Sequence, residues 1–144
     1  MLQIVGSVVT GTPAVSPPGD LERYKNASGS TIEAGVAVQL SGGTGNEGEL
    51  DLASADGSDV FGITLEEIEN DDYGRIQILA PGMIVKGLAD AEADIGNTVG
   101  LNDSSDGFDN GDNSAFLVIK VGEDEDGDLK LVWAVPVGGA LAVV

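Results

Sequence analysis

The stretch AFLVIKVGEDEDGDLKLVWAV, residues 115–135, decides the fold class of this chain. Residues 115–121 and 129–135 are rich in Val, Leu, Ile and aromatic side chains, which favour β-strands. Between them lies a polar segment, residues 122–128, with Asp126-Gly127 as a turn signal. The pattern predicts an antiparallel hairpin with a long loop. Because both runs are partly apolar on both faces, we expect at least one face to meet another sheet or another subunit.

Short strands of the same kind are predicted along most of the chain, with turn signals between them. They cover residues 2–9, 35–40, 49–52, 60–65, 75–79, 83–88 and 97–101. Pro81-Gly82 predicts a type II turn, in which Gly supplies the positive φ. Residues 65–70 and 88–94 are the only helical windows, and each allows one or two short turns at most. The sequence therefore predicts an all-β domain of the sandwich or barrel type.

Both ends of the chain are expected to lie outside this domain. Residues 1–20 predict an extended N-terminal arm because Pro17-Pro18 removes two backbone donors, residues 21–136 predict the β-rich domain, and residues 137–144 predict an apolar tail. Apolar residues in such segments favour docking onto a neighbouring protein. Trp133 is expected in the core or at an interface. The residues expected at capsid or subunit contacts are Leu2, Ile4, Val5, Val8, Pro13, Pro17, Pro18, Trp133 and Leu141.

The composition argues against several functional classes. The 144 residues include no His and no Cys, so the chain has no imidazole base, no thiol nucleophile and no ordinary zinc ligands. Six basic and 25 acidic residues give a net charge of −19, which disfavours binding to nucleic acid. No apolar run approaches the ~20 residues of a membrane span, and the first residues do not resemble a secretory signal. The charge also fits a soluble surface or adaptation to high salt.

Acidic residues form two clusters that could carry chemistry. Asp103, Asp106, Asp109 and Asp112 lie in a loop, residues 102–113, that does not match the ligand spacing of an EF-hand. A looser Ca²⁺ site there is left open, although Asx-turns are the favoured interpretation. The second cluster comprises Glu66, Glu67, Glu69, Asp71 and Asp72. A glycosidase also needs a cleft lined by aromatic residues, so we interpret this cluster as a charged loop and expect neither catalysis nor a cofactor.

The order of these elements resembles a known family. Residues 34–40 precede residues 60–64, then residues 74–79 and 82–85 in the position of a hairpin, and then residues 94–101. This order of glycine and apolar residues resembles the small head-decoration, or capsid cement, proteins of tailed bacteriophages, including the lambda type. The resemblance covers residues 30–135.

The resemblance implies a structural virion protein with a small β-tulip or barrel fold and no enzymatic activity. It implies homotrimers at three-fold positions on the outer surface of the expanded capsid, bridging major capsid protein subunits after synthesis in the host cytoplasm. It also implies an N-terminal arm that becomes ordered on the capsid. The alternatives are another virion β-domain, in a tail tube, baseplate or head-fibre base, a secreted β-sandwich that binds Ca²⁺ and sugar, and a carboxylate hydrolase.

Overall fold

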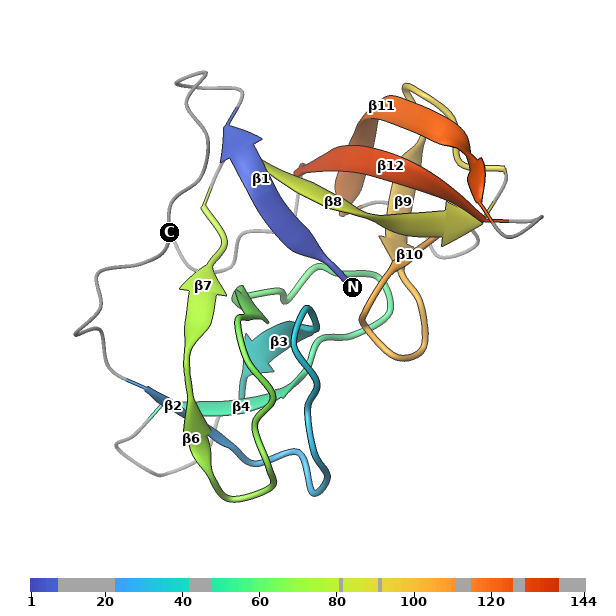
Figure 1. Cartoon of the computed structure of the whole chain (residues 1–144). Helices are drawn as coiled ribbons and strands as arrows, with labels where there is room; N and C mark the ends of the chain where they lie inside the picture. The colour runs from blue at the N-terminus through green and yellow to red at the C-terminus, as the bar shows by residue number, and fades with distance from the viewer. Residues whose placement is uncertain are drawn as a thin grey trace.

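The computed structural model describes residues 1–7, 23–41, 48–80, 82–90, 92–110, 115–125 and 129–137. These residues form twelve strands in two six-stranded sheets, and none of them is helical (Figure 1). The all-β prediction is confirmed. The two helical windows are corrected: residues 88–90 continue a strand, and residues 65–70 form bends, turns and an isolated bridge between Ile32 and Ile68. None of the described residues belongs to a helix that could span a bilayer.

The first sheet contains the predicted hairpin. Its order is β1 (Gln3–Ser7), β8 (Met83–Asp90), β12 (Leu129–Pro136), β11 (Phe116–Glu125), β9 (Thr98–Leu101) and β10 (Phe108–Asp109), and all its neighbours are antiparallel. The register runs from Phe116 opposite Pro136 to Glu125 opposite Leu129, with two irregularities. The hairpin is confirmed, and β11 extends four residues beyond its predicted end at Val121.

The second sheet curls into a barrel-like form. Its order is β6 (Tyr73–Gly74), β2 (Tyr24–Asn26), β4 (Glu49–Leu52), β3 (Ala37–Leu40), β5 (Gly62–Thr64) and β7 (Ile76–Ile78). Only β2 and β4 pair in parallel. The strands β6 and β7 lie at opposite ends of this order, yet only Arg75 separates them in the chain. The two edges of the sheet are therefore one nearly continuous stretch.

The chain crosses from the second sheet to the first at residues 79–83. Gly82 has a φ of 81°, and the Met83 amide donates to the Ala80 carbonyl oxygen at 3.2 Å, which confirms a turn at the predicted place. This turn does not close a hairpin, contrary to the expectation from the family resemblance. β7 pairs with β5, whereas β8 pairs with β1 and β12. Local turn chemistry predicted the change of direction but not the choice of partner strand.

The two sheets share one core. The main cluster combines Val85, Phe116 and Val132 of the first sheet with Ile63 and Leu79 of the second sheet and its following segment. A smaller cluster lies in the second sheet and contains Ile32, Val36, Val38, Leu50, Phe61, Ile68 and Ile76. Backbone hydrogen bonds also join the two halves, with Ala37 donating to Ser105 at 2.7 Å and Leu101 donating to Ala55 at 2.6 Å. The sheets therefore pack as one domain.

Residues 1–7 belong to that domain. Gln3–Ser7 pair with β8, and Leu2 is only 1% exposed. The predicted arm can therefore begin only after Ser7. Residues 8–20 and 138–144, which hold most of the predicted arm and tail, lie outside the described residues. Of the predicted tail, only Val137 is described.

Candidate docking surface

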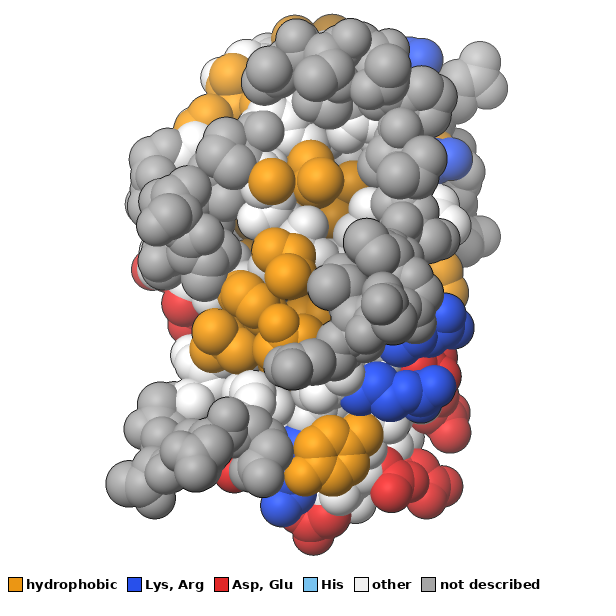
Figure 2. Space-filling view, turned by 90° about the vertical axis from the view of Figure 1, so that its left-hand side faces the viewer, with side chains coloured by type: hydrophobic (Ala, Val, Ile, Leu, Met, Phe, Trp, Pro, Cys, Tyr) orange, Lys and Arg blue, Asp and Glu red, His pale blue; other side chains and the backbone are white. Residues whose placement is uncertain are grey.

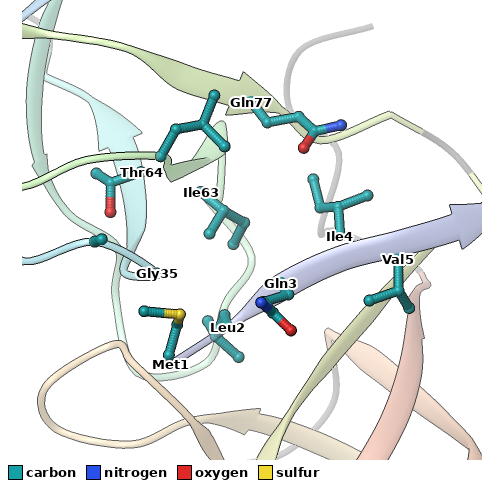
Figure 3. Close-up of a pocket in the computed structure, with 11 residues that line it drawn as sticks. Met1, Leu2, Gln3, Ile4, Val5, Gly35, Ile63, Thr64 and Gln77 are labelled. Atoms are coloured by element: carbon teal, nitrogen blue, oxygen red, sulfur yellow. The ribbon is translucent and has the colours of Figure 1, made fainter. Parts of the chain in front are cut away.

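A pocket of about 290 Å³ lies where β1 approaches the second sheet. Figure 3 shows β1 on one side and the residues of β5 and β7 on the other, with Ile4 directed toward Gln77. The lining residues are mainly apolar. They comprise Met1, Leu2, Gln3, Ile4, Val5, Ala34, Gly35, Ile63, Thr64, Leu65 and Gln77. None of these eleven described lining residues has an ionisable side chain, so the described lining provides mainly contact area.

The wall opposite β1 is held by local hydrogen bonds. The Thr64 hydroxyl donates to the Glu33 carbonyl oxygen at 2.7 Å and accepts a hydrogen bond from the Val36 amide at 3.0 Å. Gly35 has a φ of 80°, and a Cβ there would overlap the Met1 side chain. Glycine at position 35 therefore allows both the turn before β3 and the close approach of the N-terminus.

Apolar side chains are also exposed around this pocket. Met1 and Leu65, which line it, are 61% and 37% exposed, and Ile78 of β7 is 36% exposed. Figure 2 views the molecule from the side on which β7 lies in Figure 1, and hydrophobic side chains gather in the middle of that face. Exposed apolar surface of this kind is typical of protein contact sites.

The structure separates the residues that were predicted at partner contacts. Leu2 is corrected: its side chain packs into the core of its own chain and is not presented to a partner. Ile4 and Val5 are half-buried and line the pocket. Trp133 is half-buried on β12, which β8 separates from β1, and it is not among the lining residues of the pocket. The remaining predicted contact residues, Val8, Pro13, Pro17, Pro18 and Leu141, lie outside the described residues.

Trp133 has two neighbours that the sequence alone did not identify. Lys86 of β8 and Lys120 of β11 lie opposite Trp133 in the two adjacent strands. Their Nζ atoms lie 5.6 Å and 4.6 Å from the centroid of the indole ring, within the range of cation–π interactions. These residues are far apart in sequence, and only the strand register brings them together.

The loop with the candidate Ca²⁺ ligands is stabilised by its own polar groups. Asn102 Oδ1 accepts a hydrogen bond from the Asp106 amide at 3.1 Å, and Asn102 Nδ2 donates to the Asp106 carboxylate at 2.8 Å. These hydrogen bonds span four residues rather than the two of an Asx-turn, so they hold the loop without confirming the Asx-turn interpretation. Within the described part of the chain, which excludes Asp112, no three acidic side chains are grouped closely enough to hold a metal ion.

A second hollow, of about 380 Å³, adjoins this loop. Asp90, Asp106 and Asp109 are among its lining residues, together with the apolar side chains of Leu88 and Phe108. One carboxylate oxygen of Asp90 accepts a hydrogen bond from the Asn110 amide at 3.4 Å. The other Asp90 oxygen is buried and has no hydrogen-bond partner among the described residues.

The second acidic cluster connects β5 to β6, as its interpretation as a charged loop requires. The Arg75 amide donates to the Glu66 carboxylate at 2.8 Å, and this hydrogen bond is the main reason that the pKa of Glu66 is lowered. Glu67 behaves in the opposite way, because a hydrogen bond and charge repulsion from Glu33 raise its pKa. A carboxylate held ionised, as Glu66 is, is poorly suited to act as the general acid of a glycosidase.

Comparison with known proteins adds no family assignment. The chain matches no protein-family model and no curated protein. Its function must therefore be inferred from its own residues and geometry.

Proposed function

We propose that this chain is a structural protein of a tailed-phage particle. It decorates the outer surface of the expanded head and bridges major capsid protein subunits, as a trimer at three-fold positions. The observation that carries this proposal is the apolar pocket between β1 and the second sheet, together with the exposed side chains of Met1 and Leu65 at that pocket. A cement protein acts by contact with several neighbours at once, and many modest contacts then add through avidity.

The strand pattern on which the family resemblance rests supports the same function. Residues 37–40, 62–64 and 98–101 of that pattern are strands, and Ala37, Ile63 and Val99 within them are buried in the main core cluster. The glycines of this strand pattern also have structural roles. Gly35 and Gly96 have positive φ values, and Gly62 lies against the backbone of Gln77. The resemblance therefore follows positions that determine the fold.

The charge distribution supports a place on the outside of a head. A net charge of −19 is tolerated where the chain faces solvent, but it is strongly unfavourable where the chain would pack against DNA. The described residues also give little support to a carboxylate hydrolase or a Ca²⁺-binding module. Glu66 is held ionised by Arg75, and Asn102 and Asp106 hydrogen-bond to each other.

Co-sedimentation with expanded phage heads that lack a decoration protein tests this function. We expect the wild-type chain to sediment with the heads and to saturate at a fixed number of copies per capsid. Leu65→Asp places a charge at the pocket and is expected to weaken binding at least tenfold. Ile95→Asp is the matched control, because Ile95 is 64% exposed and does not line the pocket. Absence of wild-type binding to expanded heads would contradict the proposal.

A further inference from the structure

Two glutamate side chains face each other beside the docking pocket. The bridge between Ile32 and Ile68 is antiparallel, so Glu33 and Glu67, one position along each segment, lie directly opposite each other. Ile32 and Ile68 are buried, whereas Glu33 and Glu67 are exposed on the other face. The two carboxyl groups are close enough to share a hydrogen bond. We define Glu33 and Glu67 as the carboxylate pair.

The carboxylate pair adjoins the wall of the pocket that the second sheet provides. Ala34, which follows Glu33, lines the pocket, and so does Leu65, two positions before Glu67. The hydroxyl of Thr64, in the same wall (Figure 3), donates to the carbonyl oxygen of Glu33 at 2.7 Å. Leu65 and Glu67 are both exposed. A partner that covers the exposed side chain of Leu65 therefore also comes close to the carboxylate pair.

No basic side chain of the chain itself neutralises the carboxylate pair. The whole sequence has six basic residues, and the structure describes all of them: Arg23, Lys25, Arg75, Lys86, Lys120 and Lys130. Two of them form ion pairs, Arg75 with Glu66 and Lys130 with Asp94, and none of the six forms one with either member of the carboxylate pair. A basic side chain that neutralises the pair must therefore come from another molecule.

Contact with a partner increases the need for this counter-charge. Like charges that lie directly opposite each other are destabilising even at an exposed position. A partner over Leu65 displaces water from the two carboxylates, and their repulsion then grows because the effective dielectric constant falls. A cationic side chain of the partner, placed between the two carboxylates, replaces this repulsion by attraction.

We infer that the segment of the major capsid protein that fills the pocket carries a basic side chain, which the carboxylate pair binds. This inference rests on the proposed function and specifies the chemistry of the partner. None of the described lining residues has an ionisable side chain, so the part of the segment inside the pocket is uncharged and apolar. The basic residue lies beside that part. An arginine suits the pair best, because its planar fork of five donors can reach both carboxylates.

The carboxylate pair also makes the contact selective. A chain with a net charge of −19 is attracted to any basic surface, but that attraction alone fixes no orientation. The pocket and the pair together require an apolar side chain and a basic side chain next to each other. A surface that presents an acidic or an apolar residue at the pair leaves the repulsion in place, so it binds more weakly.

Charge reversal of the pair tests the inference by co-sedimentation with expanded heads. Glu33→Lys/Glu67→Lys is expected to bind at least tenfold more weakly than wild type, because two cations then face the basic residue of the partner. Glu92→Lys/Asp103→Lys is the matched control. It makes the same change in net charge at two exposed positions that do not line the pocket, and it is expected to bind within about threefold of wild type.

Neutralisation of the pair separates binding from folding. Glu33→Gln/Glu67→Gln removes the repulsion together with the charge, so we expect it to melt no lower than wild type and yet to bind heads at least threefold more weakly. Wild-type binding that neither substitution of the pair weakens would overturn this inference and leave the proposed function intact. An equal loss in the Glu92 and Asp103 control would overturn it as well, since net charge alone would then explain the effect.

The free chain provides the remaining comparison. If the wild-type chain associates with itself in sedimentation equilibrium, and the same substitutions at Glu33 and Glu67 abolish that association, a second copy is the partner of the pair and the inference is overturned. Failure of the wild-type chain to bind expanded heads would contradict the proposed function and, with it, this assignment of the partner.

Discussion

The backbone amide of Leu2 donates a hydrogen bond to the carbonyl oxygen of Gly35 at 2.8 Å. This bond joins the residue before β1 in the first sheet to the turn before β3 in the second sheet. The Leu2 side chain is 1% exposed and belongs to the core cluster that both sheets share. The first residues of the chain thus hold the two halves of the domain together and form one wall of the candidate docking pocket.

Leu2→Ala is therefore expected to destabilise the whole domain. Removal of a buried leucine side chain costs roughly 2–5 kcal/mol, because apolar contacts are lost and a cavity remains. Urea denaturation followed by Trp133 fluorescence measures the loss. Ile95→Ala is the control, since Ile95 is 64% exposed, and a change within about 0.5 kcal/mol is expected there. Equal stability of the two variants would show that Leu2 is not part of the core in solution.

Gly62→Ala is expected to strain the pairing of β5 with β7. A Cβ at Gly62 would lie 2.6 Å from the Gln77 backbone oxygen, and backbone in a sheet cannot move aside easily. We expect a loss of about 1–3 kcal/mol, as for other overpacked sites. Gly122→Ala is the strand control, because its Cβ would meet neighbours only at 3.4 Å and beyond. Thermal melting distinguishes them, and a Gly122 variant that melts lower than the Gly62 variant would contradict the structure.

Most strands could be predicted from local sequence, because alternating apolar residues and turn signals are local properties. Residues 49–52 and the hairpin of β11 and β12 followed the pattern closely. The two-residue strands β6 and β10 were missed, since Tyr73-Gly74 and Phe108-Asp109 are too short to show a period. Strand partners were harder to predict, because pairing such as that of β2 with β4 depends on the packing of the whole chain.

The candidate sites were predicted less completely than the fold. Trp133 was identified, but Lys86 and Lys120 were not, since nothing in the sequence fixes the register that places them beside it. Leu2 was expected to contact a partner because it is apolar and lies near the N-terminus, whereas the structure buries it within the chain. Composition shows how apolar a segment is, but burial decides whether its side chains are exposed to a partner.

Asn26→Asp is expected to disrupt the loop between β2 and β3. Asn26 is fully buried, and its Nδ2 donates to the Ser30 and Ile68 carbonyl oxygens at 2.7 Å and 2.8 Å. An ionised aspartate cannot donate, so both carbonyl oxygens lose this donor and face a buried carboxylate, at a cost of at least about 2 kcal/mol. Asn70→Asp is the control, since Asn70 is exposed, its oxygen accepts from the Gly29 amide, and the substitution removes only an exposed 3.3 Å hydrogen bond from Nδ2 to Asp71. Chemical denaturation at neutral pH should show a large loss at position 26 alone, and equal losses would contradict this role.

Glu67→Gln is expected to stabilise the domain at neutral pH. The hydrogen bond and repulsion from Glu33 raise the pKa of Glu67, so the folded state binds that proton more tightly than the unfolded state does. Ionisation of Glu67 therefore lowers stability as the pH rises through its folded-state pKa. We expect the variant to melt above wild type at about pH 7 and the difference to shrink by about pH 4. Glu69→Gln controls for the loss of one charge in the same loop, and an equal or larger gain from it would exclude Glu33 as the cause.

Electron cryomicroscopy of expanded heads reconstituted with the purified chain tests the proposed function most directly. We expect three copies of the two-sheet domain around three-fold positions on the outer surface, with the pocket lined by β1 facing the shell. Heads that show no added density, or density confined to their interior or to a tail, would contradict the assignment of this chain as a decoration protein.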